Sequence, residues 1–65
     1  MASFHEVEMV REHIRLGATH ITRQHRIIEH LRDLGADVEL ALDVLANLQD
    51  SQTLHHVHLR RALRA

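Results

Sequence analysis

Leu34-Gly35-Ala36-Asp37 (residues 34–37) separates two segments of this 65-residue chain that carry the same apolar pattern. Gly35 can adopt the left-handed backbone conformation that closes a helix, and Asp37 belongs to the residue types that cap the start of the next one. This stretch therefore predicts a first helix that ends near residue 33, a turn at 34–36 and a second helix from about residue 37.

The outer ends of both helices carry matching signals. Ser3 followed by Glu6 is typical of a capping box, so the first helix is expected to begin near residue 4. The second helix is expected to continue to about residue 63, which makes residues 1–65 one domain. Its charges complement the helix dipole. Carboxylates stand at its start and arginines at its end: Asp37, Glu39 and Asp43, then Arg60, Arg61 and Arg64.

Between these signals, residues recur in steps of three and four, the spacing of a coiled-coil interface. We call these sixteen positions the seam. They are Val7, Val10, Ile14, Gly17, Ile21, Gln24, Ile28 and Leu31 on the first helix, and Val38, Ala41, Leu45, Leu48, Gln52, His55, Leu59 and Ala62 on the second. Because a short turn makes long helices antiparallel neighbours, Leu31 is expected beside Val38 and Val7 beside Ala62. The predicted fold class is all-α, an antiparallel helical hairpin.

A glycine and two glutamines interrupt the apolar seam. Gln24 and Gln52 are expected to fix the register of the helices at some cost in stability. Gly17 lies inside a helix, where glycine costs about 1 kcal/mol relative to alanine, and faces Gln52 in the register. We expect the missing side chain to make room for the Gln52 amide. A kink or close crossing used by a ligand is the alternative.

One side of the hairpin carries apolar residues outside the seam, and we call these six residues the apolar flank. They are Met9, Leu16, Ile27, Leu40, Val44 and Leu54. A second apolar face implies a second buried interface. At ~25 cal/mol per Å², burying six such side chains is worth on the order of 10 kcal/mol. The predicted partner is a second copy, giving a homodimeric four-helix bundle with His20 also at the dimer interface. Another helical protein is the alternative partner.

Histidine is the compositional outlier, with eight residues in the chain. In the hairpin register His13 lies across from His58, and His55 is one turn away on the seam. Three neutral imidazoles from two helices can bind zinc or another divalent metal. Alternatively, the histidines fill half-buried positions as mid-sized polar side chains. A third reading is a pH-dependent role, in which the dimer loosens below about pH 6 because histidine titrates near neutrality.

Composition argues against several other classes of protein. The chain has no cysteine, one aromatic residue (Phe4) and a net charge of −1. Its outward arginines alternate with carboxylates, which does not favour a nucleic-acid partner. No apolar run reaches membrane-spanning length and no signal peptide is found, so a cytoplasmic location is expected. No nucleophile, carboxylate pair or phosphate loop indicates an enzyme.

Two resemblances accompany this reading. The run His20-Ile21-Thr22-Arg23-Gln24, the turn Gly35-Ala36-Asp37 and the segment His55-His56-Val57-His58-Leu59-Arg60 resemble a class of short bacterial helical-hairpin proteins without an assigned activity. The architecture is also similar to that of Rop, a dimeric helical hairpin that regulates plasmid copy number and grips paired RNA loops. This chain lacks the lysines and the exposed aromatic residue that RNA binding of that kind would need on its first helix.

The sequence therefore predicts a non-enzymatic, homodimeric interaction or regulatory module. Binding of a divalent metal or a metal-containing cofactor through His13, His55 and His58 is the first alternative. Rop-like RNA binding is the second.

Overall fold

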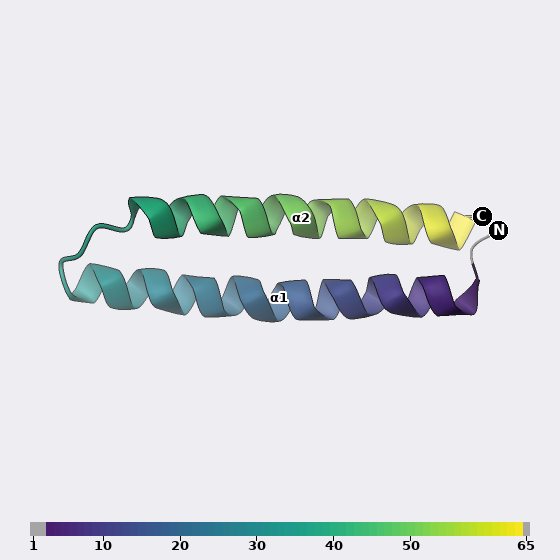
Figure 1. Cartoon of the computed structure of the whole chain (residues 1–65), viewed down its shortest axis with the longest axis horizontal. Helices are drawn as coiled ribbons and strands as arrows, with labels where there is room; N and C mark the ends of the chain where they lie inside the picture. Colours follow the sequence, from purple (N-terminus) through teal and green to yellow (C-terminus); the bar gives the residue numbers. More distant parts are fainter. Residues whose placement is uncertain (1–2, 65) are drawn as a thin grey trace.

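The computed structural model describes residues 3–64 and contains two helices, α1 (Phe4–Asp33) and α2 (Glu39–Arg64). The helices lie side by side and antiparallel along their whole length, so that the start of α1 and the end of α2 are at the same end of the molecule (Figure 1). The hairpin is a rod with principal extents of 50 × 14 × 10 Å. The predicted all-α helical hairpin is confirmed.

The turn has the geometry that its residues predict. Gly35 is left-handed, with φ of 69°, and its amide donates to the Arg32 carbonyl at 2.9 Å. The Ala36 amide donates to the Leu31 carbonyl at 2.9 Å. This pair of bonds is the Schellman motif, which satisfies carbonyls at the end of a helix that would otherwise lack partners.

Both helix starts are capped by side chains. The Ser3 hydroxyl accepts from the Glu6 amide at 3.1 Å, which is the hydroxyl half of the predicted capping box. At the second helix the Asp37 carboxylate accepts from the Glu39 amide at 2.9 Å. The Leu42 amide bonds to the Val38 carbonyl, so α2 begins at Glu39, two residues after the expected position. Asp37 therefore caps from just outside the helix.

The seam forms the contact between the helices. All sixteen seam residues are buried or half-buried, and the only other described residue in these classes is Val57. The fully buried part is nevertheless small. Among residues 3–64 it consists of Ile28 and Leu45, which are 3% and 9% exposed, and the polar Gln24 at 9%. Within the same residues, neither helix is long and apolar enough to cross a membrane.

Candidate functional site

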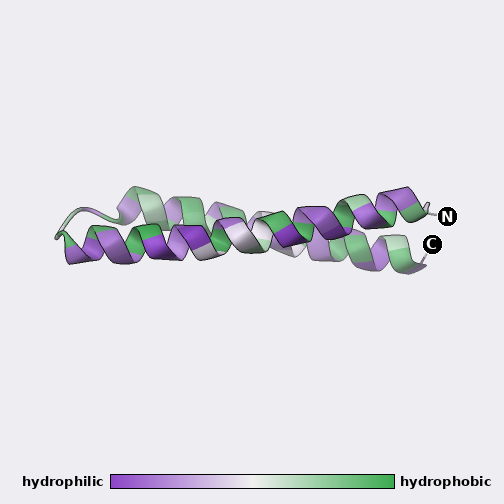
Figure 2. Ribbon diagram, turned by 90° about the horizontal axis from the view of Figure 1, so that it is seen from below, coloured by the Kyte–Doolittle hydropathy of each residue, from purple (hydrophilic) through white to green (hydrophobic). Residues whose placement is uncertain are grey.

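The apolar flank is exposed in the single hairpin. Its six residues keep between 39% (Val44) and 76% (Leu40) of their surface accessible. Figure 2 shows hydrophobic and hydrophilic residues alternating along the full length of both helices. Exposed apolar area of this extent, running along one side of a rod, is typical of an interaction surface.

Among residues 3–64, four further large apolar residues are exposed that the seam and the apolar flank do not include: Phe4, Leu34, Leu42 and Leu63. At 100° per residue, Leu34 extends the apolar flank toward the turn. The other three fall on the opposite side of the hairpin, which is therefore not purely polar. Their positions in the sequence could have indicated this side of the hairpin. Leu42 and Leu63 directly follow seam residues, and Phe4 lies three residues before one.

Gln52 is a seam residue that joins the two helices beside the middle of the apolar flank. Its amide Nε2 donates to the Ile14 carbonyl of α1 at 2.8 Å, which links the two helices through a side chain. A Cβ atom at Gly17 would lie 2.8 Å from the Gln52 Cδ atom and closer still to its Oε1 atom. The steric explanation of Gly17 is therefore confirmed, because the amide occupies the space that a side chain would need.

Gln24 makes the equivalent bond in the turn half of the hairpin. Its Nε2 atom donates to the Ala41 carbonyl of α2 at 2.9 Å. Each glutamine thus reaches the backbone of the opposite helix. Because these bonds satisfy polar groups that the seam removes from water, they offset part of the cost of placing an amide there.

A groove of about 260 Å³ opens on the flank beside Gln52. Its lining residues come from both helices and combine apolar, amide and imidazole groups: His13, Leu16, Gly17, His20, Leu48, Ser51, Gln52 and His55. Its position near the middle of the rod places it where an interface along the flank would be centred.

Two of the three histidines proposed as metal ligands meet in this region. The rings of His13 and His55 lie 5.4 Å apart between centroids and are tilted by 41°. The His55 Nδ1 atom lies 3.4 Å from the Gln52 Oε1 atom. The sequence placed His13 across from His58 with His55 one turn away, and the structure sets the His13 ring against His55. Within residues 3–64 no three histidine, aspartate or glutamate side chains are arranged to hold a metal ion, so the metal site stays a prediction.

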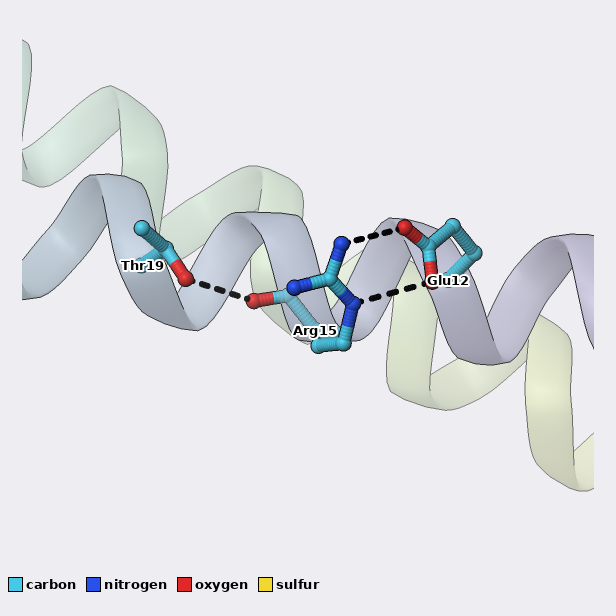
Figure 3. Close-up of polar contacts among 3 residues, drawn as sticks. All are labelled: Glu12, Arg15 and Thr19. Carbon is cyan, nitrogen blue, oxygen red and sulfur yellow. Dashed lines mark hydrogen bonds and ion pairs between the residues drawn. The ribbon is translucent and has the colours of Figure 1, made fainter.

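The outer face of α1 neutralises its own charges. Arg15 donates to both carboxylate oxygens of Glu12, at 3.0 Å from Nε and 2.5 Å from Nη2 (Figure 3). These hydrogen bonds hold the pKa of Glu12 below its usual value. The Thr19 hydroxyl donates to the Arg15 carbonyl at 3.2 Å.

Comparisons with family models, with curated proteins and with solved structures find no match for this chain.

Proposed function

We propose that this chain is a non-enzymatic interaction or regulatory module that acts as a homodimer, in which two hairpins associate through the apolar flank into a four-helix bundle. The observation that carries the proposal is the exposure of all six flank residues in the single hairpin. Full burial of each leucine, isoleucine, valine or methionine side chain is worth about 1.5–3 kcal/mol.

The surface area of the hairpin supports a partner of this size. A compact 7.5 kDa chain is expected to expose about 4,250 Å², whereas the hairpin exposes 5092 Å². The excess of about 840 Å² is close to the roughly 800 Å² that each partner buries in a standard interface.

The dimensions of the rod lead to the same conclusion. Its radius of gyration is 15.1 Å, against about 10.7 Å for a compact chain of this length. A second hairpin laid along the flank would thicken the rod without lengthening it. Association of this kind is how small domains with thin cores commonly gain stability.

Sedimentation equilibrium at tens of micromolar tests the proposal. We expect a species of twice the 7.5 kDa chain mass. Leu16→Asp, at a flank residue that is 40% exposed, should give a monomer. The matched control is Leu42→Asp, at a leucine on the opposite side that is 41% exposed, and it should stay dimeric. A monomeric wild-type protein would overturn the homodimer and leave a different helical protein as the partner of the flank.

A second candidate function, binding of a divalent metal, is favoured by the contact between His13 and His55. His58, or a histidine of a second copy, would have to supply the third ligand. Native mass spectrometry with added zinc should then show bound metal, and zinc should raise the Tm of the wild-type protein but not that of His58→Ala. Absence of bound zinc together with an unchanged Tm would contradict this function.

A further inference from the structure

The apolar flank divides into two groups of three residues. Ile27, Leu40 and Val44 lie in the turn half of the hairpin, and Met9, Leu16 and Leu54 lie in the open half. In the register that sets Gly17 against Gln52, the midpoint between the groups falls near His20 on α1, and Ser51 is a nearby α2 residue on the same side of the hairpin. Both of these residues are exposed and line the groove. A two-fold axis perpendicular to the rod at this level would place the turn-half group of each hairpin against the open-half group of the other.

Apolar matching alone permits two orientations of the hairpins. If the turns lie at the same end, each apolar group meets its own equivalent and α1 packs across from α2 of the other copy. If the turns lie at opposite ends, each group meets the other group and each helix packs across from its own equivalent. Electrostatic complementarity distinguishes arrangements that apolar contact leaves equal.

The charges of α2 and its cap are strongly polarised. The segment 37–50 carries four carboxylates and no basic residue, namely Asp37, Glu39, Asp43 and Asp50. The segment 51–64 carries Arg60, Arg61 and Arg64 and no acidic residue. In contrast, the segment 4–33 that forms α1 carries five carboxylates and five arginines, and is neutral. Of these groups, Asp37 and Arg61 lie on the flank side of the hairpin, so the orientation of α2 relative to its equivalent decides whether acidic and basic groups of the two copies meet.

We infer that two copies associate with their turns at opposite ends, so that the acidic start of each α2 lies against the arginine-rich end of the other. In this arrangement His20 of one copy faces His20 of its partner across the two-fold axis. With the turns at the same end, the two acidic segments share one end of the bundle and the two basic segments share the other. The inference rests on the proposed homodimer and specifies its geometry.

Single cysteines report this orientation directly, because the chain has no native cysteine. His20→Cys places one thiol per copy at the inferred axis. The matched control is His25→Cys, an exposed histidine of the same helix that lies on the opposite side of the hairpin. Association raises the effective concentration of neighbouring thiols to about the millimolar range. Oxidation or a short bis-maleimide should therefore link His20→Cys on the order of tenfold faster than His25→Cys.

The outcomes separate the orientation from the homodimer. If His20→Cys forms covalent dimers and His25→Cys does not, the turns lie at opposite ends of the bundle. In the same-end arrangement residue 20 instead faces residue 51 of the other copy. An equimolar mixture of isotopically labelled His20→Cys and unlabelled Ser51→Cys would then give mixed covalent dimers, while His20→Cys alone would not link. That result would overturn the orientation and retain the homodimer. A wild-type protein that sediments as a monomer would overturn both.

Discussion

Substitution of Gly17 by alanine tests the central contact of the hairpin, because its effect should depend on Gln52. In an ordinary helix interior this change stabilises by about 1 kcal/mol. Here the added Cβ displaces the Gln52 amide, since it would lie 2.8 Å from Cδ. The displaced amide loses its 2.8 Å bond to the Ile14 carbonyl, a bond of a class worth about 0.5–1.5 kcal/mol. Gly17→Ala alone should therefore change stability by less than about 1 kcal/mol.

The same substitution should become stabilising once Gln52 is removed. Gln52→Ala deletes the interhelical bond and leaves the hollow at Gly17 empty, so it should destabilise by roughly 1–2 kcal/mol. In that background the alanine at residue 17 meets no amide and regains its full helix propensity, about 1 kcal/mol. We expect a coupling free energy between the two changes of about 0.5–1.5 kcal/mol, which is the contribution of the hydrogen bond that Gly17→Ala removes only while Gln52 is present.

Urea unfolding followed by far-ultraviolet circular dichroism measures this coupling in a double-mutant cycle. Protein concentration must be held fixed, because the stability of a dimer depends on it. The control pairs Gly17→Ala with Gln24→Ala, which removes the equivalent bond to the Ala41 carbonyl without touching Gly17. The control pair should be additive within about 0.5 kcal/mol. Additivity of the Gly17 and Gln52 pair as well would refute the steric explanation.

Four other predictions follow from particular contacts. Gly35→Ala should cost about 1–2 kcal/mol through backbone strain alone, because Gly35 has φ of 69° and no atom near its missing Cβ; unchanged urea stability would contradict this. Acidification below about pH 6 should weaken the dimer in sedimentation, since histidine gains positive charge there. The charged and titratable groups on the apolar flank and in its groove are Glu6, His13, His20, Arg23, His30, Asp37, His55, His58 and Arg61. An unchanged dimer at pH 5 would contradict this prediction. Arg15→Gln should raise the pKa of Glu12 toward its ordinary value in an NMR titration, because Arg15 hydrogen bonds lower it; any stability contributed by this pair is present at neutral pH and is lost as the pH falls through the lowered pKa. The Tm should rise with protein concentration, since a tenfold change shifts the unfolding equilibrium by about 1.4 kcal/mol, and a constant Tm would indicate a monomer.

The sequence predicted the backbone arrangement closely, because residues spaced by three and four lie on one face of a helix and a hairpin buries the two such faces against each other. Every predicted seam residue is buried or half-buried. The turn followed from Gly35, since few residue types adopt its conformation without strain. Helix α2 nevertheless begins two residues late, because a carboxylate can cap from one position further out than the pattern assumes.

Side-chain arrangements were less accessible to sequence reasoning. Heptad register gives the level of each residue along the rod but not its rotamer. The register therefore brought His13, His55 and His58 to one region, whereas the contact of the His13 ring with His55, close to the Gln52 amide, depends on the rotamers. Leu42 and Leu63 were not predicted to form part of an apolar surface; each directly follows a small seam residue, Ala41 or Ala62.

The two seam glutamines connect the fold to the proposed assembly. An all-leucine seam would bury more apolar surface, but one heptad of sliding would leave it nearly as well packed. With Gln24 and Gln52 in place, the same shift of register would break both hydrogen bonds to the backbone of the opposite helix. It would leave two amides in the seam without hydrogen-bond partners. The hairpin therefore gives up stability for a single register. That register aligns Ile27 with Val44 and Leu16 with Leu54 on one side, which an interface built from both helices requires.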